Sequence, residues 1–379
     1  MIAIESQPSI PSSDRQVFAN VAPGELKFGD SDEFHRELRR RVDQYFQSSG
    51  KRQRDCLQMY LKTATILATL TASYVLLLFV VTAWWQALPL AILLGLSMAA
   101  VGFNIQHDGG HSAYSSRPWI NRLMATTLDL LGGSSYCWAR KHNTIHHSFA
   151  NITGHDDDIN LGFLGRLSPH QKRLKVHGFQ HYYLWALYGF LPMKWQIFDD
   201  FRDLTRGRIG GHRMARPKGW DLVTFLGGKA FFFTLAMVIP LMLHPVWAVL
   251  LVYAAASFVQ GVALSVVFQL AHCVEEASFP MPSPESGRME SAWAVHQVET
   301  TVDFARGSRL LSWLVGGLNF QIEHHLFPRI CHIHYPAISS VVEQTCHDFG
   351  VRYVAHETLF GGIRSHYRLL REMGRPIAN

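Results

Sequence analysis

The sequence is short of charge. Only 17% of its 379 residues are Asp, Glu, Lys or Arg, against about 25% in an ordinary soluble domain. Hydrophobic residues make up 48%, which excludes a disordered chain and argues against a wholly soluble one. Basic residues exceed acidic ones by only six, scattered along the chain, so we expect no nucleic-acid partner.

Several chemical motifs are also missing. The five cysteines are odd in number and include no Cys-x-x-Cys pair, which argues against a disulfide framework or a Cys-rich zinc site and indicates free thiols in a reducing compartment. His-Glu-x-x-His, the motif of zinc proteases, and Glu-x-x-His, the motif of soluble di-iron carboxylate proteins, do not occur. The N-terminus lacks the order of regions that marks a signal peptide, namely a charged start, a short apolar core and a cleavage site. We therefore expect no signal peptide.

Long apolar runs, by contrast, are frequent. Four of them, at about 63–85, 87–105, 222–243 and 246–271, are long enough to cross a hydrocarbon layer of ~30 Å as helices. The first two are nearly contiguous, as are the last two, which predicts two helical hairpins. Lys229 lies inside the third run, where we expect its side chain either to snorkel to the membrane interface or to face the protein interior.

Basic residues precede the first and third runs, and the predicted hairpin tips carry none. The positive-inside rule therefore puts both termini and the long segments 106–221 and 272–379 in the cytoplasm. We expect an all-α integral membrane protein, with four transmembrane helices as two hairpins plus a cytosolic helical cap. Its parts would be a polar N-terminal cytosolic segment at 1–56, a membrane domain at 57–354 and a C-terminal cytosolic tail at 355–379.

Histidine is unusually abundant, with 21 residues, and three clusters have helical spacing. Residues at i, i+3 and i+4 share one helix face, so the imidazoles of a cluster can converge on a metal. The clusters read HDGGH at 107–111, HNTIHH at 142–147 and QIEHH at 321–325. In the second cluster His147 is turned about 100° from the other two histidines, which suits either two metals or one metal and a hydrogen-bond partner.

The predicted topology brings these clusters to one membrane face. The second and fourth runs end there, at His107 and His272, and the other histidines lie in the two cytoplasmic segments. Eight neutral imidazoles can hold two first-row metal ions, and histidine suits iron, zinc, copper and nickel. Gly109 and Gly110 would leave room for another helix or for the metal. With the zinc and carboxylate motifs missing, a His-rich pair of irons beside a lipid-facing interior is what remains.

At these clusters the chain resembles the integral-membrane fatty acid desaturase and hydroxylase superfamily, whose signature is three histidine boxes. The resemblance covers roughly 57–354 and is extended by HHSFANITGHDDDI at 146–159 and NFQIEHHLFP at 319–328. A Gln opening the third box is typical of the front-end branch, which inserts a double bond between the carboxyl group and an existing double bond. The resemblance implies four transmembrane helices with a cytosolic cap, two non-haem iron ions, O2 and two electrons per turnover.

The resemblance also implies roles for individual residues. Gln321 departs from the commoner His and would bind iron, hold a water or orient a ligand. From their place just after the second box, Asp156, Asp157 and Asp158 would orient ligands or a substrate head group, with a solvated acidic turn as the alternative. The implied metal ligands are His107, His111, His142, His146, His147, His272, His324, His325 and Gln321, and the supporting residues are Asp108, Asn143, Asp156, Asp158 and Glu323.

The implied partners are a fatty acyl substrate, carried by CoA, a carrier protein or a lipid ester, and the lipid bilayer. The His-Pro-Gly-Gly sequence of a fused cytochrome domain does not occur, so we expect a separate electron donor of ferredoxin or cytochrome type. A hydroxylase, acetylenase or carotenoid-modifying enzyme with the same boxes remains the alternative, because the outcome depends on how the chain is held. A haem protein or a metal transporter is disfavoured, since its polar groups would lie inside the spans.

Overall fold

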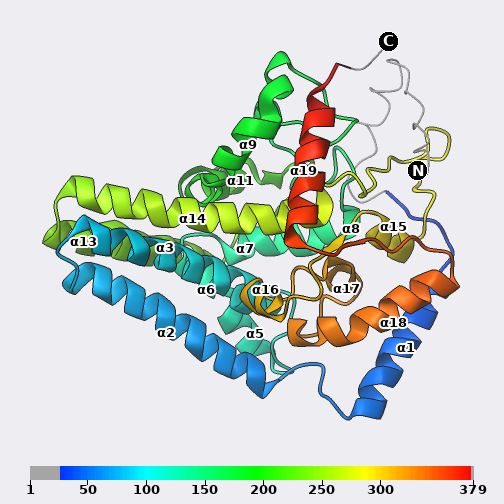
Figure 1. Cartoon of the computed structure of the whole chain (residues 1–379), viewed down its shortest axis with the longest axis horizontal. Helices are drawn as coiled ribbons and strands as arrows, with labels where there is room; N and C mark the ends of the chain where they lie inside the picture. Colours follow the sequence, from blue (N-terminus) through cyan, green and yellow to red (C-terminus); the bar gives the residue numbers. More distant parts are fainter. Residues whose placement is uncertain (1–25, 377–379) are drawn as a thin grey trace.

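The computed structural model describes residues 26–376, so residues 1–25 of the expected N-terminal segment and 377–379 of the expected tail lie outside it. This part of the chain is mostly helical, with two short strand pairs. Four helices are long and apolar enough to cross a membrane, namely Leu57–Phe79, Trp84–Gly110, Trp220–Leu243 and Val246–His272. They extend to one side, and the other helices gather around their opposite ends (Figure 1). The expected all-α membrane fold with a helical cap is confirmed.

The first hairpin turns earlier than the run 63–85 suggested. Helix α2 (Leu57–Phe79) ends before a non-helical stretch at 80–83, and α3 (Trp84–Ala100) then begins. Residues 80–82 are Val, Val and Thr, whose β-branched side chains lower helix propensity, so the chain reverses there and not at Gln86. The other expected runs agree more closely: the second continues past 105 to Gly110, and the last two differ from expectation by two residues or fewer.

The second and fourth spans pack closely against each other. A Cβ atom on Gly95 of α3 would lie 2.3 Å from the carbonyl oxygen of Ala256 in α14 (Val246–His272), so no larger residue fits at this crossing. His107 lies in the last turn of the second span, and His272 is the last residue of the fourth. Their close packing therefore sets the spacing between two of the expected metal ligands.

Lys229 in α12 (Trp220–Phe233) is buried and faces the protein interior. Of the two expected positions, its side chain does not take the one at the membrane interface. Its Nζ atom donates to Oδ2 of Asp200 at 2.7 Å, to the carbonyl oxygen of Gly132 at 2.6 Å and to that of Gln196 at 3.1 Å. A buried ammonium group is tolerable only with such partners. The contact ties the third span to the cap.

The cap consists of short helices from three parts of the chain (Figure 1). Helix α1 (Glu33–Ser49) packs against α18 (Tyr335–Asp348). Helix α19 (Leu359–Gly374) packs against α14 and against α9 (Gln180–Tyr188), and its His366 is hydrogen-bonded to Tyr188 of α9 at 2.8 Å. The described part of the expected C-terminal tail is therefore folded against the spans. The elements between the hairpins are α5 (Pro118–Ala125), α6 (Thr127–Leu130), α7 (Ser135–Trp138), η4 (Ala139–His146), α8 (His147–Phe149), η5 (Gly162–Leu164), η6 (Lys175–Phe179), α9 (Gln180–Tyr188), α10 (Leu191–Lys194), η7 (Trp195–Asp199), α11 (Asp200–Arg206), β1 (Arg208–Ile209) and β2 (His212–Arg213).

The remaining bounds complete the order of elements. The second span continues through η3 (Val101–Gln106) and α4 (His107–Gly110), and the third through η8 (Thr234–Val238) and α13 (Ile239–Leu243). After the fourth span come α15 (Trp293–Glu299), β3 (Asp303–Phe304), α16 (Arg309–Leu314), α17 (Gln321–Leu326), η9 (His332–His334), α18 (Tyr335–Asp348), β4 (Ala355–His356) and α19 (Leu359–Gly374). Strands β1 and β2 pair antiparallel, and β3 and β4 pair parallel.

We expect Lys229→Ala to destabilise the protein by about 3–5 kcal/mol, because it leaves the Asp200 carboxylate and the backbone carbonyls buried without their partner. Thermal unfolding of the detergent-solubilised protein should show a clear loss of melting temperature. Lys218→Ala, at an exposed lysine just before the same helix, should unfold as the wild type does. Equal melting temperatures for the two variants would contradict a stabilising role for the buried contact.

Candidate metal centre

The first histidine box begins where the second span ends. A π-helical turn, η3, precedes His107, and such wide turns are frequent at functional sites. The ring centroids of His107 and His111 lie 4.7 Å apart. A Cβ atom on Gly109 would lie 2.6 Å from the backbone nitrogen of Ala125, and one on Gly110 would lie 2.3 Å from the Trp138 ring. The two glycines thus make room for neighbouring helices, one of the two expected uses.

The second box forms another π-helical turn, η4, followed by α8. Its wide turn brings the His147 ring to 4.8 Å from that of His142, although ordinary α-helical geometry turns the two apart. The Nδ2 atom of Asn143 donates to the carbonyl oxygen of Gly110 at 2.7 Å. This bond fixes the second box against the first.

The third box is the short helix α17, all of whose residues are buried. Its first turn is held by Asp303, whose Oδ1 atom accepts a hydrogen bond from the backbone N–H of Ile322 at 3.0 Å. The His324 ring lies 4.4 Å from that of His107, and the His325 ring lies 4.2 Å from that of His147. One short helix therefore contacts both other boxes.

His272, the last residue of α14, is fully buried. Its ring lies 4.6 Å from that of His146 and 4.8 Å from that of His325. An isolated histidine at the end of an apolar run is thereby brought to the boxes, as the predicted topology suggested.

The eight histidines form two adjoining groups. Within each group, one ring nitrogen from every residue lies within 4.8 Å of the others. His147 lies between the groups, because it forms a further such set with His324 and His325. The first group is His107, His111, His142 and His324, and the second group is His146, His272 and His325.

The hydrogen bonding of these rings fits a bound metal. A metal-bound histidine typically donates its other ring N–H to an acceptor. Four rings have such a partner for Nδ1, namely Asp156 for His146 at 3.0 Å, the Thr300 carbonyl for His272 at 3.2 Å, Tyr335 for His324 at 3.2 Å and Gln297 for His325 at 2.8 Å. The Nε2 atoms that are buried without a partner are those of His111, His142, His146, His147, His272, His324 and His325.

Burial also sets the protonation of these rings. It lowers the pKa of His111, His142 and His147 well below the usual value, with neighbouring histidines adding to the effect. The pKa values of His324 and His325 are lowered in the same way. Neutral rings keep a lone pair for a metal.

His146 is the exception among the rings. Burial is the largest single effect and opposes its protonation, but the Asp156 and Asp158 carboxylates together raise the pKa of the ring. The contact with Asp156 therefore favours a proton on Nδ1 of His146, and the lone pair of Nε2 is left for a metal.

The other candidate supporting residues occupy different places. Asp158 lies 2.9 Å from the Nζ atom of Lys141 and 3.7 Å from Nδ1 of His146. Asp108 accepts from Nδ1 of His332 at 2.9 Å, so it holds a histidine outside the two groups. Glu323 points away from the rings to Tyr353, whose hydroxyl donates to it at 2.9 Å, and burial raises the pKa of Glu323 well above its usual value.

Gln321 opens α17 on the turn that carries the two histidines of the third box. Its side chain is buried, and its Oε1 atom has no hydrogen-bond partner. An unpartnered buried oxygen costs free energy, about 1–3 kcal/mol. A role as metal ligand or as partner of a bound water would satisfy it.

Sequence reasoning missed the residues that hold the rings. Tyr335 and Gln297 have no motif to mark them, and Thr300 acts through its backbone carbonyl, which no side-chain pattern reveals. Trp138, whose ring stacks on that of His142 at 4.6 Å between centroids, precedes the second box by four residues. That helical spacing was the one available signal.

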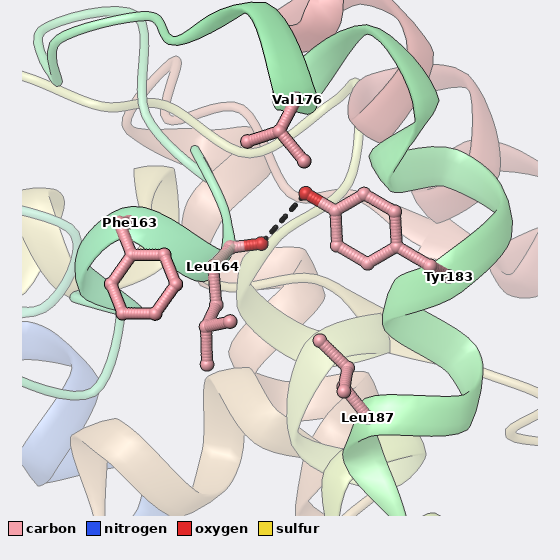
Figure 2. Close-up of a pocket in the computed structure, with 5 residues that line it drawn as sticks. All are labelled: Phe163, Leu164, Val176, Tyr183 and Leu187. Carbon is pink, nitrogen blue, oxygen red and sulfur yellow. Dashed lines mark hydrogen bonds between the residues drawn. The ribbon is translucent and has the colours of Figure 1, made fainter.

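An apolar pocket of about 290 Å³ lies outside this centre. It is lined by Phe163, Leu164 and Val176 together with Tyr183 and Leu187 of α9 (Figure 2). The Tyr183 hydroxyl donates to the Leu164 carbonyl at 2.8 Å across it. None of the eight histidines lines this pocket, so it is separate from the candidate metal centre.

Comparisons with known proteins give a consistent picture. A model of the family described as fatty acid desaturase matches residues 82–357. The chain is 40% identical over 353 residues to an sn-1 linoleoyl-lipid 6-desaturase of Arthrospira platensis, covering 92% of this chain and 94% of that protein. It is 37% identical to a protein of the same name from Synechocystis sp., covering 92% and 98%. An acyl-lipid (8-3)-desaturase of Physcomitrium patens is 36% identical, covering 96% and 76%.

We expect Tyr335→Phe to weaken metal binding by about 10–100-fold, because it removes the hydrogen-bond partner that orients His324. The metal content of protein purified at limiting metal, measured by mass spectrometry of the elements, checks this. Tyr45→Phe, in the half-buried part of α1, should retain wild-type content. The idea fails if Tyr335→Phe binds metal as tightly as Tyr45→Phe.

Proposed function

We propose that this chain, which belongs to the fatty acid desaturase family, holds two non-haem iron ions. The chain is an oxidoreductase that desaturates acyl chains, and its relatives include desaturases of the front-end type. The observation that carries the proposal is the set of buried, unpartnered Nε2 atoms in two adjoining groups. Desaturation removes two hydrogens and their electrons from the substrate. Zinc has no redox chemistry, whereas iron has it and is suited to imidazole.

The ligand assignment follows the two groups. Each iron takes the Nε2 atoms of one group, and His147, between the groups, completes one of the two sets. The Oε1 atom of Gln321 supplies a weaker, neutral ligand or holds a water. The proposed ligands are His107, His111, His142 and His324 for one ion, His146, His272 and His325 for the other, with His147 and Gln321 in addition.

When bound, the two irons supply the activation of O2 that removal of hydrogen from two adjacent unactivated carbons requires. The protein orients the rings through the acceptors on Nδ1 and keeps water out. Ile145 and Ile322 are almost fully buried beside the second and third boxes. Ile145 packs in an apolar cluster with Met214, and Ile322 packs in one with Val342, so both boxes are anchored in the core of the cap.

We propose a lipid-linked acyl chain as the substrate and carbon 6 as the position of the new double bond. Two relatives that cover more than nine-tenths of this chain are named sn-1 linoleoyl-lipid 6-desaturases. The glutamine that opens the third box supports insertion between the carboxyl group and an existing double bond. The names of the relatives favour a lipid ester over CoA or a carrier protein.

Membrane orientation and electron supply complete the proposal. Basic residues at the ends of the first and third spans support a cytoplasmic location for both termini and for the metal centre. For the two electrons we propose a separate donor of ferredoxin or cytochrome type. The bilayer supplies the lipid substrate from the side.

Expression in a host that contains linoleoyl lipids tests the function. We expect total fatty acids, analysed by gas chromatography with mass spectrometry and double-bond location, to contain a new double bond at carbon 6. The purified protein should contain about two irons per chain. Full activity with zinc alone would contradict the iron assignment, and a retained oxygen atom in the product would indicate hydroxylation.

His272→Ala supplies a matched test within the same host. We expect it to reduce product formation at least 100-fold with the protein still in the membrane, since it removes one donor from the second group. His347→Ala, at an exposed histidine near the end of α18, should leave product formation unchanged. Comparable product from the two variants would remove His272 from the ligand set.

Gln321 requires a comparison of two substitutions. Gln321→Ala removes the oxygen and should lower activity more than Gln321→His, which still offers a nitrogen. A loss in the alanine variant beyond the roughly 100-fold that residues behind a ligand typically cost would favour a direct bond to iron. Iron content should be measured together with activity, because this distinguishes a variant that has lost its iron from one that keeps the iron but reacts more slowly. Wild-type activity and wild-type iron content in Gln321→Ala would show that Gln321 contributes packing alone and neither binds iron nor holds a water.

A further inference from the structure

Two cysteines that play no part in the metal centre lie together where the first span begins. Cys56 precedes α2 directly and is half-buried, whereas Cys331 is fully buried just before η9. Cys56 packs against the buried apolar cluster that contains Cys331, although 275 residues separate the two in sequence. Each thiol is the largest influence on the pKa of the other. The backbone N–H of Cys331 also donates to the carbonyl oxygen of Gln53 at 2.9 Å. The contact is therefore part of a packed junction.

A histidine faces the more exposed thiol. The Nε2 atom of His334 lies 2.9 Å from the carbonyl oxygen of Arg52 and 3.3 Å from the sulfur of Cys56. A carbonyl oxygen only accepts hydrogen bonds, so Nε2 carries a proton and can also donate to the sulfur. The Cys331 thiol and then His334 stabilise the thiolate against the effect of burial, and the pKa of Cys56 falls to about 5. A half-exposed thiolate is the reactive form of cysteine.

A metal site is the alternative use of this region. Asp108, Cys331 and His332 offer atoms within 4.8 Å of one another. The Nζ atom of Lys62, however, lies 2.9 Å from Nε2 of His332. The Nδ1 atom of His332 is already bonded to Asp108 at 2.9 Å, so both ring nitrogens have protein partners and the thiol pair remains as the chemically active feature.

We propose that Cys56 and Cys331 form an oxidative modification site that reacts with hydroperoxides and closes to a disulfide. The Cys56 sulfur attacks the outer oxygen of the hydroperoxide, the O–O bond breaks, and the alcohol leaves with the thiol proton, so that Cys56 becomes a sulfenic acid. The Cys331 sulfur then attacks the Cys56 sulfur, the S–O bond breaks, and water leaves with the Cys331 proton. Two thiols lose two electrons, and one hydroperoxide gains them.

The structure assigns different roles to the two residues. Cys56 is reached from outside, because it adjoins exposed Arg52 and the exposed start of α2. Cys331 has no exposed surface, so it meets the oxidant only through Cys56. The other cysteines, Cys137, Cys273 and Cys346, are buried, and burial raises the pKa of each of the three thiols. They should be inert under the same treatment.

Peptide mapping of the purified full-length protein tests the site. After hydrogen peroxide, blocking with N-ethylmaleimide and digestion without reductant, we expect one cross-linked peptide that joins Cys56 to Cys331 and is cleaved by dithiothreitol. Without peroxide, Cys56 should react with limiting iodoacetamide at least tenfold faster than Cys346. No cross-link, or a cross-link to another cysteine, overturns the proposal, as does equal alkylation of Cys56 and Cys346.

Variants separate attack from closure. In Cys331→Ser we expect the sulfenic acid of Cys56 to persist and to be trapped by dimedone, because the second thiol is lost. Cys346→Ser should still form the cross-link. If Cys331→Ser traps no sulfenic acid while remaining monodisperse in size-exclusion chromatography, Cys56 is not the attacking residue. The map of the wild-type protein decides the matter if the variant fails to fold.

Discussion

The structure depends on a set of buried ring nitrogens that face one another with no protein partner. Each would cost about 1–3 kcal/mol if left unsatisfied, and seven such Nε2 atoms meet at the ends of the membrane helices. Either a bound ligand or favourable packing elsewhere in the fold has to offset this unfavourable free energy. The close approach of α3 and α14 at Gly95, the bond from Asn143 to the first box and the acceptors on Nδ1 all serve that purpose.

Much of this arrangement follows from sequence. Apolar run length indicated the four spans, and helical spacing with topology indicated the eight histidines. The turn of the first hairpin was misplaced, because the length of an apolar run does not distinguish the β-branched stretch at 80–82 from the apolar helix before it. The partners of the rings were not foreseeable either. Tyr335, Gln297 and the Thr300 carbonyl reach the site by tertiary packing, and Asp108, adjacent to a ligand, serves His332 instead.

Buried polar contacts join the cap to the spans, in addition to the apolar clusters that both share. Lys229 reaches from a membrane helix into the cap, and His366 on α19 reaches back to Tyr188 and to the carbonyl oxygen of Cys273. A polar bond buried at such a junction is strong, since water cannot compete for it. The cap therefore behaves as a rigid extension of the spans, and the histidines it carries keep their distance from those at the helix ends.

The π-helical turn before His107 has a further consequence. A π turn amounts to one extra residue within an α-helix, so the second span contains one residue more than its straight path needs. Loss of one residue from η3 is therefore absorbed when the π turn becomes regular helix, and His107 and His111 keep their direction. Loss of one residue from the regular part of α3 would instead rotate His107 and His111 together by about 100°. The membrane helix ahead of the π turn is thus the part of this span whose exact length aims the first box.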